Sequence, residues 1–359
     1  MKKFKVVDLF SGCGGFSYGF ESAGYHVVLG VDNDKQALDT FKANHTNSRT
    51  LLADLHKEEA IHEILSIVDG QEIDVIIAGP PCQGFSLTGT RRREDARNKL
   101  FYSVFKLADK LNPKAIIIEN VPGLATLYEG HAKEAILEEF DRLGLTKNFQ
   151  VLFAPDYEVP QIRKRIFFVG LRPDFGTFEF PEPILKPDEY NTCSIAIGDL
   201  PSLVDTLGQE KATYTNPPLT PYQKKMRNGT DVLNNHVATK HTEHVINVIS
   251  QVPEGGNHKN LPPGVGDSRK FNEAWTRYHS NKPSKTIDTG HRNHFHYQYN
   301  RIPTVRENAR LQSFPDSFIF YGNKTQQYRQ VGNAVPPLLG YHIAKRLSEH
   351  LNKGRDEKK

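Results

Sequence analysis

Apolar runs alternate with amphipathic segments along the first half of the chain. Each apolar run is short, nearly continuous and typical of a strand that is buried on both faces. We predict strands at 4–10, 25–32, 50–53, 73–79, 113–120 and 165–171. Apolar strands that alternate with helices indicate a parallel sheet with helices on both faces, and such sheets bind ligands at the carboxyl ends of their strands.

Between these runs, apolar residues recur at the spacing that is typical of amphipathic helices. The positions that share one predicted helix face are Phe16, Phe20 and Ala23, then Ala37, Leu38 and Phe41, then Leu100, Val104, Leu107, Ala108 and Leu111. A last helix is predicted near the end of the chain, with Leu339, Ile343, Leu347 and Leu351 on one face. The first half is therefore predicted to be an α/β domain.

The segment 183–300 has a different character, because it is rich in Pro, Asn, Thr, His and Gly and loses its periodicity. We predict a catalytic and cofactor-binding domain at 1–185, a second, irregular and mainly β domain with a hinge at 186–320, and a return to the first domain at 321–359. No internal repeat or low-complexity tract interrupts this organisation.

Composition excludes several classes of protein. Hydrophobic residues make up 37% and charged residues 25% of the 359 positions, which is typical of a globular protein. No apolar run is long enough to span a bilayer, and Asp8 interrupts the apolar start, so neither a membrane protein nor a signal peptide is expected. The three cysteines lack metal-ligand spacing, which argues against a disulfide framework and a metal site and favours a reducing cytoplasm. A net charge of +4 permits a polyanionic partner without requiring one.

A glycine-rich turn, DLFSGCGGF at 8–16, follows the first predicted strand and opens a helix. Glycines allow a tight turn, and helix N–H groups face a ligand there. Because Ser17 stands where a dinucleotide fingerprint has its third glycine, the turn favours an adenosine ligand without a pyrophosphate, such as S-adenosylmethionine. A tight turn with no ligand is the alternative.

Two carboxylates end the next strands. Asp32 lies twenty positions after Gly12 and could accept hydrogen bonds from ribose hydroxyls. Asp54 could reach an adenine amino group, or else it caps the helix that follows.

Cys82 lies just past the fourth predicted apolar strand, where Pro80 and Pro81 stiffen the approach and a polar loop follows. A lone cysteine is usually a buried structural residue. The prolines and the polar loop favour a thiolate nucleophile instead.

Glu119 and Asn120 end the next strand, so they are predicted to share the carboxyl edge with Cys82. Glu119 could act as an acid or a hydrogen-bond donor, or it caps the following turn. Arg163 and Arg165 are two apart at the start of a strand, where alternation would put them on one face to hold an anion or a carbonyl oxygen. The alternative is a solvated charge run.

Together these stretches resemble the bacterial DNA (cytosine-5) methyltransferases. The resemblance covers nearly the whole chain outside 183–300, in the family's order. It is carried by DLFSGCGGF, GVDNDKQALDTF, GPPCQGFS, ENVPG, QIRKRIFFVG, RENARLQSFPDSF and QVGNAVPP. It implies a Rossmann-like, S-adenosylmethionine-dependent methyltransferase sheet with a smaller, irregular, mainly β target-recognition domain.

The resemblance also implies a mechanism. The Cys82 thiolate adds to cytosine carbon 6, Glu119 protonates or hydrogen-bonds ring N3, and carbon 5 then attacks the methyl group of S-adenosyl-L-methionine, leaving S-adenosyl-L-homocysteine. A base removes the carbon 5 proton and the cysteine is eliminated. Arg165 would contact the carbonyl oxygen of the base, Arg163 would support the loop or the thiolate, and Asn120 would fix the backbone at Pro81 and Cys82.

The remaining roles follow from the same resemblance. The cofactor-binding residues would be Phe10, Gly12, Gly14, Gly15, Asp32, Asn33, Asp54, Leu55, Pro80 and Asn333. The residues that contact DNA would be Gln83, Ser86, Arg91 and Arg97, in a loop that closes over a flipped-out base. No metal is implied.

Partners are predicted from the same family. Double-stranded DNA is the expected substrate, and the basic, aromatic stretch 269–310 is expected to contact it. Arg310, Leu311 and Phe314 are expected to brace the two domains. We further expect a cytoplasmic bacterial monomer with no membrane partner, and a possible cognate restriction endonuclease that acts on the same site without a stable complex.

Two other functions remain open from the sequence. One is an RNA cytosine-5 methyltransferase, which the long segment 183–300 disfavours. The other is a DNA-binding protein or a nucleotide-dependent oxidoreductase on the same sheet. Ser17 argues against a dinucleotide, and Cys82 with Glu119 would have no task in a protein that only binds.

Overall fold

The structure is a computed structural model that describes residues 3–81, 99–265, 274–290 and 292–356. The chain divides into two compact units. The first comprises 1–153, 164–182 and 339–359, and the second comprises 154–163 and 183–338. The domain boundaries expected at 185/186 and 320/321 stay predictions.

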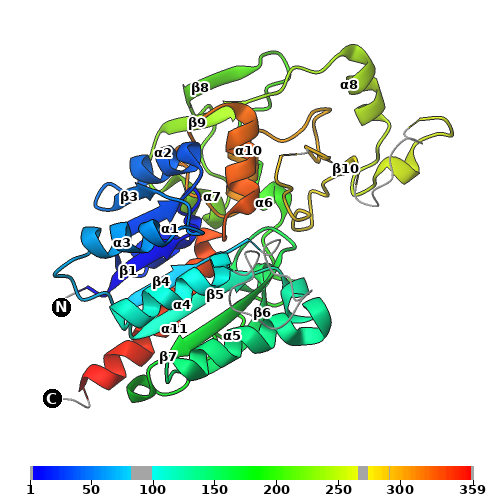
Figure 1. Ribbon diagram of the computed structural model, residues 1–359. Helices are drawn as coiled ribbons and strands as arrows, with labels where there is room; N and C mark the ends of the chain where they lie inside the picture. The colour runs from blue at the N-terminus through cyan, green and yellow to red at the C-terminus, as the bar shows by residue number, and fades with distance from the viewer. Residues whose placement is uncertain (1–2, 82–98, 266–273, 291, 357–359) are drawn as a thin grey trace. The chain divides into compact units, whose positions relative to one another are not determined.

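A seven-stranded sheet in the order β3-β2-β1-β4-β5-β7-β6 forms the centre of the first unit (Figure 1). Strands β1 to β5 are parallel, whereas β7 runs antiparallel to both β5 and β6. The bounds are β1 Lys5–Leu9, β2 His26–Asp32, β3 Arg49–Leu52, β4 Val75–Ala78, β5 Ala115–Asn120, β6 Thr146–Phe153 and β7 Lys164–Leu171. The strand order reverses between β1 and β4, which is the position where doubly wound sheets bind ligands.

Helices cover both faces of this sheet (Figure 1). The apolar sides of α3, α4 and α5 pack into one core with the sheet. On the other face, Phe16 of α1 packs against Phe167 of β7, and the Tyr25 hydroxyl donates to the Ala344 carbonyl of α11. The bounds are α1 Gly15–Ser22, α2 Lys35–Asn44, α3 Glu58–Ile67, α4 Lys99–Leu111, α5 His131–Arg142 and α11 Pro337–Asp356.

The sequence prediction of the sheet is confirmed for β1, β2, β3, β4 and β5, and the predicted helices are present as α1, α2, α4 and α11. The strand predicted at 165–171 is present as β7, but it runs antiparallel to its neighbours where a parallel sheet was expected. A continuous apolar run has the same appearance in either direction, and strand β6, which precedes β7, went unrecognised because much of it is exposed. The chain returns from β6 to β7 through 154–163 without a crossover helix, so the two strands pair antiparallel.

The second unit is built from short elements. Its strands form the antiparallel pair β8 and β9 and the two-residue parallel pair β10 and β11. Their bounds are β8 Gly208–Thr213, β9 Val232–Val237, β10 Thr276–Arg277 and β11 His294–Phe295. The helices are α6 Cys193–Ile197, α7 Pro221–Arg227, α8 Glu243–Ser250, α9 Val305–Leu311 and α10 Lys324–Asn333. The unit is irregular as expected, but it mixes helix and strand more evenly than the mainly β fold expected for it.

Candidate active site

The turn after β1 is held in a backbone conformation that few residues adopt. Phe10 has φ 57°, Gly12 has φ 53° and Gly14 has φ 94°. A Cβ on Gly14 would lie 2.2 Å from His45 Nε2, so this position requires glycine, whereas a Cβ on Gly12 would meet nothing within 4 Å. Positive φ at a bulky residue such as Phe10 is concentrated at functional sites. Gly15 begins helix α1.

Asp32 ties the end of β2 to this turn. Its Oδ2 accepts a hydrogen bond from the Gly12 amide at 2.8 Å, and its Oδ1 accepts one from the Asp34 amide at 2.9 Å. Burial raises the pKa of Asp32, and these amide hydrogen bonds oppose the shift. The carboxyl group therefore fixes the turn whether or not a ribose also binds there.

A buried pair beneath the turn was missed from the sequence. The Ser17 hydroxyl donates to Asp8 Oδ2 at 2.6 Å, and both side chains are buried. Burial raises the pKa of Asp8 to about 8, and nearby Asp32 adds to the shift. The available signal was a carboxylate inside the apolar run of β1, together with the serine that replaces the third fingerprint glycine.

The remaining predicted cofactor residues of the first unit follow β2, β3 and β4. Asn33 is exposed, and Leu55 is buried in the core. Asp54 Oδ1 accepts hydrogen bonds from the His56 amide at 3.0 Å and pairs with His56 Nδ1 at 2.9 Å. The His56 amide, followed by its imidazole, holds the pKa of Asp54 below its usual range. Helix α3 has Lys57 as its N-cap, so Asp54 does not cap that helix.

Glu119 and Arg165 form an ion pair at the edge of the sheet. Arg165 Nε lies 2.8 Å from Glu119 Oε1, and both side chains are largely buried. Glu119 Oε2 lies 3.5 Å from the point that a Cβ on Gly79 would occupy. The carboxyl group therefore lies against the chain three residues before Cys82.

Asn120 anchors the same stretch of chain. Its Nδ2 donates to the Pro80 carbonyl at 2.8 Å, and its Oδ1 accepts from the Val121 amide at 2.9 Å. The bond reaches the residue before Pro81, so Asn120 fixes the backbone one peptide earlier than predicted. Pro80 is buried and Pro81 is exposed. The predicted residues Cys82, Gln83, Ser86, Arg91 and Arg97 lie outside the described residues.

Arg163 lies one residue before β7 begins, so strand alternation does not place it on one face with Arg165. It belongs to the second unit, where it is buried and its Nη2 donates to the carbonyls of Gly332 and Ala334 at 3.0 and 3.1 Å. These carbonyls flank Asn333, which is exposed at the end of α10. Arg163 thus holds the backbone on both sides of Asn333.

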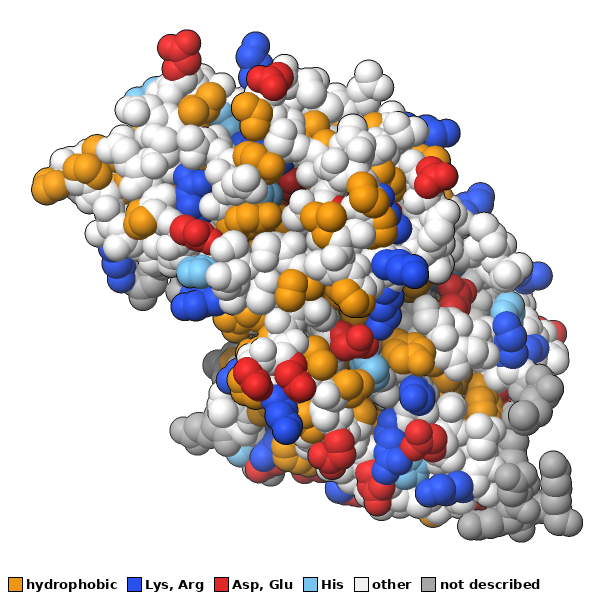
Figure 2. Space-filling view, turned by 180° about the vertical axis from the view of Figure 1, so that it is seen from behind, with side chains coloured by type: hydrophobic (Ala, Val, Ile, Leu, Met, Phe, Trp, Pro, Cys, Tyr) orange, Lys and Arg blue, Asp and Glu red, His pale blue; other side chains and the backbone are white. Residues whose placement is uncertain are grey.

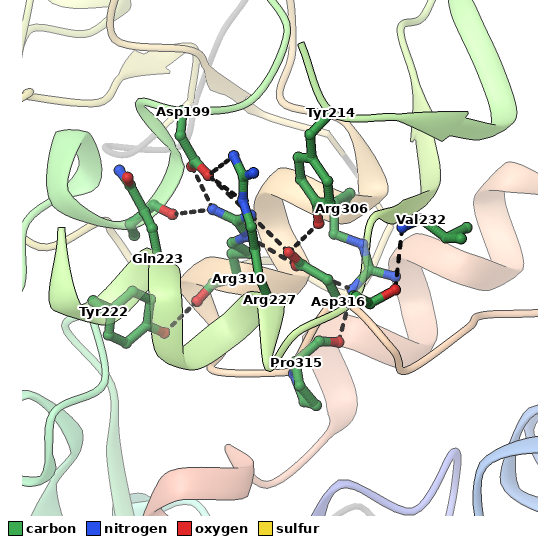
Figure 3. A network of polar contacts seen from close by, with 12 residues as sticks. Asp199, Tyr214, Tyr222, Gln223, Arg227, Val232, Arg306, Arg310, Pro315 and Asp316 are labelled. Carbon is green, nitrogen blue, oxygen red and sulfur yellow. Dashed lines mark hydrogen bonds and ion pairs between the residues drawn. The ribbon is translucent and has the colours of Figure 1, made fainter. Parts of the chain in front are cut away.

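Several arginines of the basic stretch 269–310 are interior residues. Arg310 forms ion pairs with Asp199 and Asp316, and Arg227 shares Asp199 (Figure 3). Arg306 donates to the carbonyls of Asn234, Pro315 and Phe318. Arg277 and Arg301 are buried in the same way. The expectation that this stretch as a whole contacts DNA is therefore wrong for Arg277, Arg301 and Arg306, which support the second unit. Arg310, which was expected to brace the two domains, is buried and has its ion-pair partners within the second unit.

On the face of the molecule that Figure 2 shows, the described residues form no continuous basic patch. Figure 2 shows Lys and Arg side chains interspersed there with Asp and Glu side chains. Within the described ranges, no group of three or more His, Cys, Asp or Glu residues could hold a metal ion. No helix of the described chain is long and apolar enough to cross a membrane.

Comparisons with known proteins agree with this fold. Residues 4–349 match the family model of C-5 cytosine-specific DNA methylases. The chain is 41% identical over 345 residues to the Type II methyltransferase M1.HphI of Haemophilus parahaemolyticus, covering 94% of this chain and 85% of that protein. It is 36% identical over 378 residues to M.DdeI of Desulfomicrobium norvegicum, covering 97% and 90%.

Solved structures share the architecture. A crystal structure described as that of a candidate DNA modification methyltransferase encoded within an E. coli prophage superposes with a TM-score of 0.79 at 27% identity, covering 98% of this chain and 100% of that one. A Spodoptera frugiperda DNMT2 structure has the same fold, with a TM-score of 0.62 at 16% identity and coverage of 98% and 100%. These matches agree with the glycine-rich turn after β1 and with the Glu119–Arg165 ion pair at the end of β5. The chain therefore belongs to the C-5 cytosine-specific DNA methylases and is a DNA (cytosine-5) methyltransferase.

Proposed function

We propose that the protein methylates carbon 5 of a cytosine within a specific short duplex sequence, through a covalent bond between Cys82 Sγ and cytosine carbon 6. One observation carries this proposal. Glu119, held by Arg165, lies at the end of β5 with Oε2 against Gly79, so an acid and a cation adjoin the segment that leads to the cysteine.

The arrangement of this pair suits the substrate. Cytosine presents N3 and the carbonyl oxygen O2 on adjacent ring atoms. A carboxyl group beside a guanidinium can address both, with Glu119 at N3 and Arg165 at O2. Hydrogen bonding at N3 draws electron density from the ring and makes carbon 6 a better electrophile.

Covalent addition divides the reaction into easier steps. The Cys82 thiolate forms the S–C6 bond, and the displaced electron pair moves toward carbon 5 and N3, where Glu119 stabilises it. After carbon 5 has gained its methyl group, a base removes the carbon 5 proton and the S–C6 bond breaks to release the thiolate. Asn120, bonded to the Pro80 carbonyl, holds the chain that carries the nucleophile.

Family membership implies S-adenosylmethionine, and the turn after β1 suits it. The Ser11 hydroxyl is buried and has no hydrogen-bond partner among the described residues, and a side chain on Gly12 would meet open space. When bound, S-adenosylmethionine supplies an electrophilic methyl group. Phe10, Asp32 and Asp54 would hold its adenosine, with Asn33, Leu55 and Pro80 lining the same edge, and Asn333 is proposed for the methionine end.

The substrate base must leave the helical stack, because carbon 6 is covered by its neighbours in duplex DNA. We assign Gln83, Ser86, Arg91 and Arg97 to DNA contacts that stabilise the flipped state. The Type II relatives support a restriction-modification setting. We further propose that the protein is a cytoplasmic monomer and that a separate endonuclease acts on the same site.

Radiolabelled S-adenosylmethionine, incubated with the protein and either duplex DNA or RNA, tests the reaction. We expect 5-methylcytosine in DNA digests, and bisulfite sequencing then gives the target site. Label in RNA alone would contradict the DNA reaction and support the alternative RNA substrate.

The covalent step has its own test. Cys82→Ser should keep cofactor binding and lose turnover by roughly a thousandfold or more, because a hydroxyl is a far weaker nucleophile than a thiolate. A duplex with 5-fluorocytosine at the target position should cross-link to the wild-type protein and not to the variant. Near-normal turnover by Cys82→Ser would remove the covalent mechanism.

A further inference from the structure

Arg292 of the second unit is presented by an unusually well-fixed loop. Asp288 Oδ1 accepts hydrogen bonds from the amides of Gly290 and Arg292 at 3.3 and 3.1 Å, and its Oδ2 accepts one from the Asn293 amide at 3.1 Å. Arg292 itself has φ 54°, a strained value for a non-glycine residue. The Asp288 carboxylate therefore fixes the backbone at Gly290, Arg292 and Asn293.

The guanidinium group is also held in place. Arg292 Nη2 donates to Thr325 Oγ1 at 2.7 Å, and its Cζ lies 4.9 Å from the ring centroid of Tyr328. Tyr328 is buried and its hydroxyl donates to the Pro303 carbonyl at 2.6 Å, so the ring is a fixed platform. The interaction of a water-exposed cation with an aromatic ring contributes little binding free energy. It also uses no N–H donor, so the other guanidinium nitrogens of Arg292 can still donate to a ligand.

A second cation lies close by. Lys324 donates to the Ala238 carbonyl at 2.7 Å and is partly buried. Burial lowers the pKa of Lys324, Glu210 opposes the shift, and Arg292 adds to it. Burial, followed by Arg301 and Arg292, also lowers the pKa of His241. No carboxylate of the described residues forms an ion pair with Arg292 or Lys324.

This cluster differs from the other arginines of its segment. The other described arginines are buried, and their N–H groups donate to carboxylates or carbonyls within the second unit. They are Arg277, Arg301, Arg306 and Arg310. Arg292 and Lys324 are partly exposed and form no ion pair with a carboxylate of the described residues, although Glu210 stabilises the charge of Lys324 from farther away. Holding two like charges together costs free energy unless an anion joins them.

We propose that Arg292, Lys324 and Thr325 form a phosphate cluster that binds one backbone phosphate of the DNA substrate. Two cations and a hydroxyl match a phosphate, which has several acceptor oxygens and no donor, whereas the edge of a base offers fewer acceptor atoms to this many donors. The inference depends on DNA being the substrate. It assigns these residues to positioning the duplex and not to reading its sequence.

Salt dependence of DNA binding tests the proposal. Log Kd is measured against log salt concentration for wild type, Arg292→Ala and Lys324→Ala, on duplexes with and without the target site. Because both cations bind the same phosphate, each variant should weaken that single contact, which reduces the slope by up to about 1 and weakens binding by up to about tenfold at low salt, equally on both duplexes. Lys345→Ala, which removes an exposed cation from α11, is the matched control and should change neither quantity.

Thr325→Ala should weaken binding less than Arg292→Ala and add nothing to it in the double variant, because Thr325 acts mainly by orienting Arg292. Arg292→Lys keeps the charge and the loop, and it should retain the slope while losing part of the affinity. It also serves as the folding control if Arg292→Ala is unstable.

If the slope of log Kd against log salt concentration is unchanged in both Arg292→Ala and Lys324→Ala, the proposed phosphate cluster is wrong. A loss confined to the duplex with the target site would overturn it too, because it would show base reading. The 5-fluorocytosine cross-link of the wild-type protein reports on the covalent mechanism separately, so the two proposals can fail independently.

Discussion

The two units satisfy their buried polar groups in different ways. In the first unit, the strands of one sheet supply most backbone partners to one another, from β3 through β6. In the second unit, arginine side chains do much of this work. Arg277 alone donates to the carbonyls of Ile249, Val252 and His296. An irregular fold leaves carbonyls without a ladder partner, and a planar group with five donors can serve several of them at once.

This difference changes how charge in the sequence should be interpreted. A buried arginine is tolerated only when its donors and its charge are met, so each one in the second unit has partners far away in sequence. Arg310 meets Asp199 across 111 positions of the chain. The stability of the second unit should therefore depend on a few polar side chains, and that of the first on apolar burial.

The largest expected effect is that of Arg310→Ala, which breaks the network of Figure 3. Asp316 would lose two hydrogen bonds, from Nε at 2.8 Å and from Nη2 at 2.6 Å, and would stay buried. We expect a loss of about 3–5 kcal/mol in the free energy of unfolding, because the buried carboxylates of Asp199 and Asp316 both lose their ion pair with Arg310. Urea denaturation followed by circular dichroism measures it.

Arg329→Ala is the control for that experiment, since Arg329 is exposed on α10, and it should change stability by less than about 0.5 kcal/mol. The double variant Arg310→Ala, Asp316→Ala should lose less than the sum of the single variants. Equal losses from Arg310→Ala and Arg329→Ala would show that the network does not stabilise the second unit.

A smaller effect concerns the pH dependence of stability, which differs between buried groups of the two units. Burial raises the pKa of Asp8 in the first unit to about 8, so the folded protein holds a proton that the unfolded chain releases near pH 4. The stabilising contribution of that proton is complete below about pH 4 and is lost as pH rises toward 8. Asp8→Asn should abolish this alkaline decline, which we expect to be about 2–3 kcal/mol between pH 6 and 8 at up to about 1.4 kcal/mol per pH unit.

His296 of the second unit changes stability with pH in the opposite direction. Burial lowers its pKa to about 4, so the unfolded chain binds a proton below pH 6.5 that the folded protein does not. Stability from this group is lost as pH falls from about 6.5 to 4. Because the contributions of Asp8 and His296 have opposite slopes between about pH 4 and 6.5, they largely offset each other there in wild type, and thermal unfolding should show a net decline above about pH 6.5. Asp8→Asn should remove this alkaline decline and expose the acid decline that comes from His296. An unchanged alkaline decline in Asp8→Asn would refute the assignment to Asp8.

The smallest expected effects come from a matched pair of buried tyrosines. The Tyr25 hydroxyl donates to the Ala344 carbonyl at 3.0 Å in the first unit, and the Tyr222 hydroxyl donates to the Arg310 carbonyl at 2.6 Å in the second. Tyr25→Phe and Tyr222→Phe should each cost about 1 kcal/mol and should be additive in a double variant, because they share no partner. Chemical denaturation of the four proteins measures this. A clearly larger cost at Tyr222 would show that its bond supports the Arg310 network as well.

Much of the first unit could be predicted from its sequence. The apolar runs of β4 and β5 and the helical faces of α4 and α11 depend on local periodicity, which the printed sequence displays directly. The placement of Glu119 and Asn120 at the end of β5 could be predicted for the same reason. Strand β6 was missed because an edge strand with exposed residues lacks a continuous apolar signal.

The second unit could not be predicted to the same degree. Its elements are held by contacts between residues far apart in sequence, such as Arg227 with Asp199 and Tyr214 with Asp316. No periodicity marks an arginine as interior, so Arg306 and Arg277 had the same appearance in the sequence as surface residues that bind DNA. The Asp8–Ser17 pair was missed for a related reason, since its partners lie on different elements.

The connectivity of the second unit has a practical consequence for protein engineering. The chain passes between the units four times, and the ten residues 154–163 between β6 and β7 belong to the same unit as 183–338. Within it, the Ile162 amide donates to the Ser284 carbonyl at 2.7 Å, and Gln161 Nε2 donates to the Leu311 carbonyl at 3.3 Å. A chimera that exchanges 183–338 alone for the matching segment of a relative would join two parents inside one core, so the β6–β7 connection must be exchanged with it.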